Sequence, residues 1–209
     1  MLHYKKIATA DLAVFYKPVD PIFYQWIRRL PLSEPDRARV RQAYMFAREK
    51  HYGILRKSKD RPYLIHPLQV AMEISKYKGD DATLLIAAIL HDVEEDCGVT
   101  NDEISQRFGA DVALIVEGVS KVTKAEALRY GHSDRDLLTL NKIIDYACRD
   151  LRVAIVKIFD RWHNMGTLGA LSADKRLRTA EETYLVHLPL ARRLGLRDKA
   201  RELNNLCFS

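Results

Sequence analysis

The sequence has little of what β-rich, secreted or membrane proteins require. It contains 9 Gly and 7 Pro in 209 residues. Sandwiches and barrels need many turns, so this scarcity favours helices. No stretch of 18 apolar residues occurs, and Asp11 interrupts the N-terminal segment before a signal-like apolar core forms. We therefore expect neither a membrane-spanning helix nor a secretory signal.

Cysteine is scarce as well. Cys97, Cys148 and Cys207 are odd in number, far apart and outside any Cys-x-x-Cys pair. This pattern argues against a disulfide framework and predicts a reducing, cytoplasmic location.

The charge balance is basic without a basic run. The formal net charge is +6 and the pI is about 9.2, yet lysines and arginines are interspersed with acids. This distribution argues against nucleic acid as a partner. It suits a small phosphorylated ligand, and a solvated basic surface is an equal alternative on charge alone.

Residues 1–33 differ from the rest of the chain. Pro18, Pro21 and Pro31 punctuate them, and their apolar residues fit at most one short amphipathic helix. We interpret 1–33 as an N-terminal extension that packs on a main domain formed by 34–209.

From Ser33 onwards the patterns predict an all-α fold. Hydrophobic periodicity and glycine stops place helices at 34–52, 67–77, 82–95, 101–107, 110–122, 135–148, 149–165, 173–194 and 197–206. Segment 153–159 is rich in β-branched residues and would also suit a central parallel strand. No other segment offers a strand to pair with it, so we favour the helix.

The most informative motif is the acidic run that begins at His91-Asp92 and ends at Glu95-Asp96. On one helix, Glu95 lies a turn beyond His91, and Asp96 a turn beyond Asp92. Two ligands and two spare carboxylates would then share one face beside an apolar run. The alternative is a helix end that emerges into water with solvated acids.

Two further residues could complete a metal site. His66, just before Pro67, offers a second imidazole, and Asp160 offers a second carboxylate. A mixed nitrogen and oxygen set suits manganese or another borderline divalent ion better than a thiolate-type zinc site. Lys157, Asp160, Asn164 and Thr167 are spaced to line one helical stripe, which could equally be an ordinary polar face. We expect His163 to point elsewhere on that helix and to be structural.

Taken in order, these motifs resemble the hydrolase domain of RelA/SpoT-type alarmone enzymes. The similarity runs from about Asp36 to Phe208, and the segments that carry it are 56–58, 62–67, 91–96, 117–121, 160–165, 182–183 and 189–195. The resemblance implies an HD-domain helical bundle, a Mn²⁺ cofactor and removal of the 3′-pyrophosphate from (p)ppGpp.

The resemblance also implies roles for individual residues. The metal ligands would be His66, His91, Asp92 and Asp160, and the catalytic acidic pair would be Glu95 and Asp96. The residues implied around the nucleotide and its phosphates are Arg56, Lys57, Tyr63, Asn164 and Thr167, and Lys157 and Arg161 could offset the charge of the departing pyrophosphate.

Three departures from the family pattern leave alternatives open. The 58–63 loop is one residue longer and more basic, Gly166 stands where Arg is usual, and Cys97 replaces a common Thr. An adenosine alarmone or another nucleotide is therefore a second candidate substrate, and a non-catalytic alarmone-binding module is a third reading. Nothing resembles a synthetase domain, which fits a stand-alone hydrolase or part of a longer enzyme, and the oligomeric state is not predicted.

Overall fold

The computed structural model describes residues 12–56, 61–123, 127–128 and 134–208. Within these residues the chain is an all-helical bundle without strands, apart from one isolated bridge between Leu55 and Pro62. The α-helices are α1 (Leu12–Tyr16), α2 (Asp20–Ile27), α3 (Glu34–Lys50), α4 (Ile65–Lys78), α5 (Ala82–Leu90), α6 (Val93–Cys97), α7 (Asn101–Phe108), α8 (Ala110–Val119), α10 (Arg135–Arg149), α11 (Arg152–Met165), α12 (Ala173–Glu182), α13 (Leu188–Arg193) and α14 (Arg197–Cys207). A short 3₁₀ helix, η1 (Leu168–Ala170), and a π-helical turn, η2 (Thr183–His187), complete the set. The predicted fold class is confirmed.

Side-chain caps explain where several helices begin. Ser33 Oγ accepts a hydrogen bond from the backbone N–H of Asp36, and Pro35 occupies the first turn of α3. Asp81 caps α5 through the N–H of Leu84, and Thr100 caps α7 through the N–H of Glu103. Each cap satisfies a backbone donor that the helix itself leaves unpaired.

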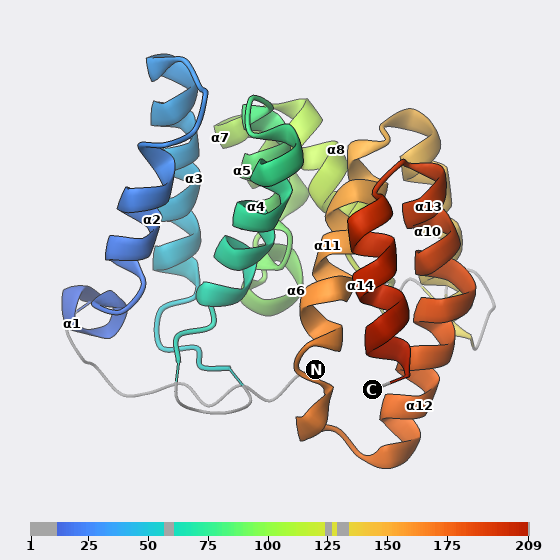
Figure 1. Ribbon diagram of the computed structural model, residues 1–209. Helices are drawn as coiled ribbons and strands as arrows, with labels where there is room; N and C mark the ends of the chain where they lie inside the picture. The colour runs from blue at the N-terminus through green and yellow to red at the C-terminus, as the bar shows by residue number, and fades with distance from the viewer. Residues whose placement is uncertain (1–11, 57–60, 124–126, 129–133, 209) are drawn as a thin grey trace.

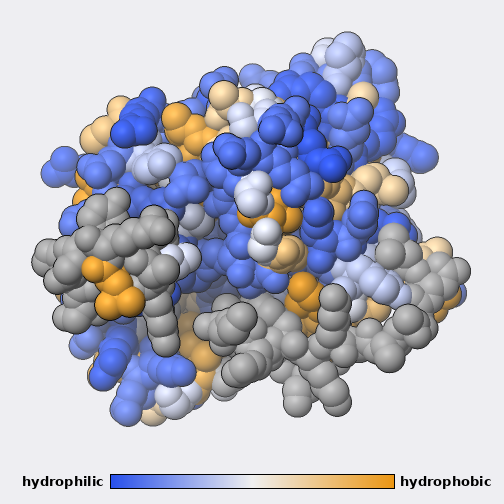
Figure 2. Space-filling model, turned by 180° about the vertical axis from the view of Figure 1, so that it is seen from behind, coloured by the Kyte–Doolittle hydropathy of each residue, from blue (hydrophilic) through white to orange (hydrophobic). Residues whose placement is uncertain are grey.

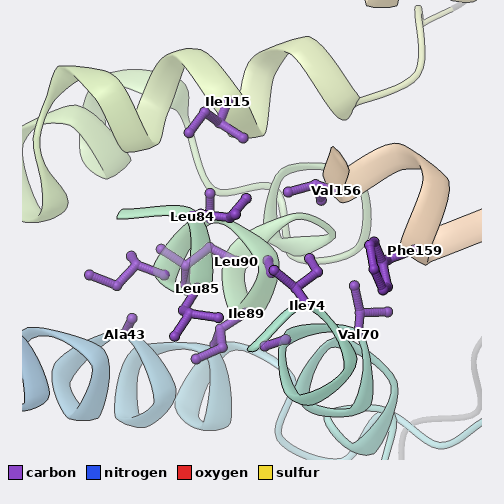
Figure 3. Packing of buried hydrophobic residues seen from close by; sticks show 14 of the residues in the cluster. Ala43, Val70, Ile74, Leu84, Leu85, Ile89, Leu90, Ile115, Val156 and Phe159 are labelled. Atoms are coloured by element: carbon purple, nitrogen blue, oxygen red, sulfur yellow. The ribbon is translucent and has the colours of Figure 1, made fainter. Parts of the chain in front are cut away.

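Helix α5 forms the centre of the molecule. Eight of its nine residues are buried, Thr83 being half-buried, and the helix contacts α3, α4, α8 and α11. Figure 3 shows Leu85 and Ile89 of α5 between Ala43, Val70 and Phe159 of the surrounding helices. The unbroken Ala/Leu/Ile run is therefore apolar on every side because every side of α5 packs against another helix.

The N-terminal segment contains two short helices, α1 and α2, so the expectation of at most one is wrong, and it shares this core. Phe23 of α2 stacks on Tyr44 of α3 with ring centroids 3.7 Å apart. Asp20 accepts hydrogen bonds from the hydroxyl of Tyr44 and the guanidinium of Arg48. In Figure 1, α2 and α3 lie on one side of the bundle and α12 to α14 on the other. The division at residue 33 stays a prediction.

Two predicted helices differ in detail. The predicted helix over 82–95 is interrupted at His91-Asp92, where α5 ends and α6 begins. The predicted helix over 173–194 contains the π-helical turn η2. Segment 153–159 lies inside α11, so the helical interpretation is confirmed and the strand alternative is wrong.

The surface agrees with the absence of apolar runs in the sequence. None of the helices in the described part of the chain is both long and apolar enough to cross a bilayer. On the face shown in Figure 2, hydrophilic residues predominate and apolar ones form small scattered patches.

Candidate metal centre

Three helical segments bring the predicted ligands together. His66 lies in the first turn of α4, and Asp160 projects from α11. His91 follows the last residue of α5, and Asp92 precedes the first residue of α6. The break between α5 and α6 therefore falls at the two adjacent ligands.

The four side chains converge within a few ångströms. His66 Nε2 lies 3.2 Å from Asp160 Oδ1 and 3.4 Å from Asp92 Oδ2. His91 Nε2 lies 3.1 Å from Asp92 Oδ2 and 3.6 Å from Asp160 Oδ1. Donors that share one ion at about 2.1 Å stand about 3.0–3.5 Å apart, so each imidazole–carboxylate separation fits a common cation. Among the described residues, His66, His91 and Asp92 each offer one ligand atom within 4.8 Å of the other two, and Asp160 is close to both imidazoles.

The hydrogen bonds of His91 leave one ring nitrogen free. Its Nδ1–H donates to the backbone oxygen of Ala88 at 2.8 Å. Its Nε2 is buried and makes no hydrogen bond to any described residue. A neutral imidazole with a protonated Nδ1 presents a lone pair at Nε2, which is the arrangement of a metal ligand. The residues present therefore fit a divalent cation.

The same cluster has strongly perturbed acid–base properties. Burial alone would lower the pKa of His91, but the carboxylates of Asp92 and Asp160 raise it well above its ordinary value. Burial opposes ionisation of both acids, yet the imidazoles of His91 and His66 hold the pKa of Asp92 and of Asp160 well below the usual range. Two buried carboxylates beside two imidazoles need a cation, either protons or a metal ion.

The predicted acidic pair lies in two different environments. Glu95 accepts hydrogen bonds from the backbone N–H of Lys121 at 2.7 Å and from its ammonium at 2.8 Å. Asp96 is more enclosed, and burial together with the charge of Asp92 raises its pKa to about 7. Glu95 is thus paired with a cation, whereas Asp96 readily holds a proton near neutrality.

Three of the predicted nucleotide contacts meet beside the cluster. The Arg56 guanidinium lies 5.7 Å from the centre of the Tyr63 ring and donates a long hydrogen bond of 3.4 Å to Thr167 Oγ1. Tyr63 itself is buried, and its hydroxyl donates to Asp92 Oδ2 at 2.6 Å. Tyr63 therefore supports a predicted metal ligand, and its contact with a nucleotide stays a prediction.

The remaining predicted contacts surround Asp160 or lie farther out. Asn164 Nδ2 donates to Asp160 Oδ1 at 2.7 Å. Lys157 is buried, which lowers its pKa, and its ammonium lies 3.9 Å from Asp160 Oδ2. Arg161 instead donates to Glu182 at 2.6 Å, and Lys57 lies outside the described residues.

Two residues at this site were not predicted from the sequence. The prediction that His163 points elsewhere is wrong, because its Nδ1 lies 2.8 Å from Nδ1 of His66. Burial and the nearby charge of His66 lower the pKa of His163 to about 3. Lys121 belongs to the 117–121 motif, but nothing in the sequence indicated that it contacts Glu95. Both contacts join residues that are distant in sequence.

Comparison with known proteins shows the family of this chain. A family model described as an HD domain matches residues 43–197. The "Bifunctional (p)ppGpp synthase/hydrolase SpoT" of Escherichia coli K12 is 43% identical over 177 residues, which are 85% of this chain and 25% of that protein. The "Guanosine-3′,5′-bis(diphosphate) 3′-pyrophosphohydrolase" of Vibrio cholerae is 41% identical over 177 residues, 85% of this chain and 24% of that protein.

A third relative is named for a pyrophosphokinase. The "GTP pyrophosphokinase rsh" of Brucella melitensis is 40% identical over 187 residues, 88% of this chain and 24% of that protein. The chain thus spans about a quarter of the length of these curated relatives. These names describe enzymes with much more sequence than this chain contains.

A solved structure shares the fold. It is described by the words "A metazoan ortholog of SpoT hydrolyzes ppGpp and plays a role in starvation responses". The TM-score is 0.63 at 22% sequence identity, and the match covers 81% of this chain and 93% of the other. At this identity the likeness shows the helical architecture alone.

Proposed function

Because the chain belongs to the HD domain family and is homologous to the hydrolase region of RelA/SpoT enzymes, we propose that it hydrolyses the 3′-pyrophosphate of (p)ppGpp. The products would be GDP or GTP and pyrophosphate. The observation that carries this proposal is the convergence of two imidazole Nε2 atoms and two carboxylates beside a second pair of acids. A phosphohydrolase needs both a cation site and groups that move protons.

His66, His91, Asp92 and Asp160 would hold the cation, and we propose Mn²⁺ because the donor set mixes imidazole nitrogen with carboxylate oxygen. When bound, a divalent ion supplies Lewis-acid stabilisation of the phosphoryl oxygens and lowers the pKa of the attacking water. Tyr63 and Asn164 would keep the two carboxylates oriented through their hydrogen bonds to Asp92 and Asp160.

The acidic pair would divide the proton transfers. Water attacks the phosphorus next to the ribose, the bond from that phosphorus to the 3′ oxygen breaks, and this oxygen takes a proton as it leaves. Asp96, with its pKa raised to about 7, suits the donor of that proton. Glu95, held by Lys121, suits the group that orients the water and accepts its proton.

Nearby cations would bind the phosphates. Arg56 is held above the Tyr63 ring and beside Thr167, where its remaining donors can reach a phosphate. Lys157 offers a buried ammonium close to Asp160. Lys57 and Arg161 belong to the same proposal, and Arg161 would have to leave Glu182 to contact the substrate.

The test is a Mn²⁺-dependent assay of pyrophosphate release from guanosine and adenosine 3′-pyrophosphates. We expect turnover of the guanosine substrate that chelation of the metal abolishes. Asp92→Ala should lose both Mn²⁺ binding and turnover. Glu95→Gln should still bind Mn²⁺ yet lose about 100-fold or more of the rate, the size of a general acid–base contribution.

Three results would contradict the proposal in different ways. Preference for the adenosine substrate would refute the assigned base. Alarmone and Mn²⁺ binding without any turnover would indicate a binding module. Near-normal turnover by Glu95→Gln would refute the role of that carboxylate alone.

A further inference from the structure

The two predicted imidazole ligands have their Nδ1 atoms satisfied in different ways. His91 follows the C-terminal end of α5, where helix carbonyls lack intrahelical partners, and its Nδ1–H donates to one of them, Ala88 O. His66 lies in the first turn of α4, where the backbone carbonyls accept the hydrogen bonds of the helix itself. Its Nδ1 therefore needs an acceptor from a side chain.

That acceptor comes from α11, which packs beside α4 (Figure 1). His66 Nδ1 and His163 Nδ1 are 2.8 Å apart, and His163 Nε2 lies 2.8 Å from Gln69 Oε1. Gln69 is three residues after His66, so both project from the same face of α4 and the His163 ring lies between them. The three side chains form a continuous series of hydrogen bonds, the His66–His163–Gln69 relay.

The donor and acceptor in each hydrogen bond of the relay follow from Gln69. An amide oxygen can only accept, so His163 Nε2 must carry the proton that it donates to Gln69 Oε1. A neutral imidazole has a single N–H, which leaves His163 Nδ1 as an acceptor. His66 Nδ1 must then be the donor, and the lone pair of a neutral His66 lies at Nε2, facing Asp92 and Asp160.

We propose that Gln69 and His163 are positioning residues, which act together to fix the protonation of His66 at Nδ1 and so keep its Nε2 available to a divalent cation. This inference rests on the proposed metal site and assigns it two further residues. Outer hydrogen bonds of this kind typically change metal affinity about 10- to 100-fold. Gln69 is exposed, so its substitution tests the relay without disturbing the core.

The experiment compares wild type, Gln69→Met and Gln69→Glu. Met has a similar length and no acceptor, whereas the Glu carboxylate only accepts and so imposes the same direction as the amide oxygen. Gln42→Met, at an exposed position on α3, is the matched control. Imidazole ¹⁵N NMR of the metal-free proteins reports which ring nitrogens carry protons, and calorimetry with Mn²⁺ reports the dissociation constant.

We expect His163 protonated at Nε2 and not at Nδ1 in wild type, Gln69→Glu and Gln42→Met. In Gln69→Met we expect a mixture of the two His163 tautomers and a Mn²⁺ dissociation constant raised about 10-fold or more. Unchanged tautomers in Gln69→Met with a dissociation constant within about twofold of wild type would overturn the relay. Failure of the wild type to bind Mn²⁺ would overturn the proposed metal site, and the NMR result would still decide whether Gln69 sets the tautomer of His163.

Discussion

At the scale of single residues, hydrogen bonds fix the orientation of the predicted ligand side chains in addition to bringing them close together. Each predicted imidazole ligand has its Nδ1 occupied by another group, and the carboxylates of Asp92 and Asp160 each accept an additional hydrogen bond. The two carboxyl groups of the acidic pair also lie in different environments. Of the two neighbouring acids, Glu95 is paired with Lys121, while burial raises the pKa of Asp96 to about 7. This separation is typical of an acid and a base with different tasks.

Lys121 is the residue whose contribution can be isolated most cleanly. Its side chain is more than half exposed, and its ammonium donates to Glu95, so Lys121→Met should leave the fold intact. We expect kcat to fall about 10-fold or more, a part of the general acid–base contribution, because Glu95 loses one of its two fixed donors. Steady-state kinetics together with Mn²⁺ calorimetry would measure this.

A conservative variant is the control for Lys121. Lys121→Arg keeps a cation near Glu95 and should retain more of kcat than Lys121→Met, while the Mn²⁺ dissociation constant should be unchanged in both. Equal kcat in wild type and Lys121→Met would show that the backbone N–H of residue 121 is enough to orient Glu95.

At the scale of helices, the close approach of α8 to α10 and α11 positions Lys121 and Lys157. Gly118 is the point of contact, because a Cβ there would lie 2.6 Å from Tyr146 Cβ and 2.9 Å from Val153 Cγ1. One residue later, the carbonyl of Val119 accepts a hydrogen bond from the Lys157 ammonium at 3.2 Å. The small residue therefore lets α8 pack closely against α11, which carries Lys157, and places Lys121, two residues beyond the end of α8, near the site.

Gly118→Ala should destabilise the protein although alanine favours a helix by about 1 kcal/mol. Overpacking of this kind costs about 1–3 kcal/mol, and here the obstructing atoms include the Cβ of Tyr146, which cannot rotate away. Urea denaturation measures the free energy of unfolding. Gly169→Ala, where nothing lies within 4 Å of the added carbon, should change it little. An increase in the stability of Gly118→Ala would contradict the packing described for α8.

The sequence predicted most helices but not the breaks that shape the site. Caps such as Ser33 and Asp81 are local signals, so the starts of α3 and α5 could be predicted from the sequence. The interruption at His91-Asp92 was not, because helical periodicity continues from Leu90 into the acids without a Gly or Pro. The π-helical turn at Thr183–His187 likewise has no simple sequence signal.

At the scale of the molecule, the site exists only because α4, α11 and the junction of α5 with α6 pack around one core. The ligand types were visible in the sequence and in its family resemblance, but their separations were not. His163 shows the limit most clearly, because its position on α11 gave no sign that His66 of α4 would lie 2.8 Å away. Contacts between distant helices follow from tertiary packing, which periodicity does not encode.

The most direct test of the account is a crystal structure of the protein grown with Mn²⁺, with data collected for manganese anomalous scattering. We predict one strong peak about 2.0–2.3 Å from His66 Nε2, His91 Nε2 and a carboxylate oxygen of both Asp92 and Asp160. A peak elsewhere, or no peak at these four side chains at saturating Mn²⁺, would contradict it.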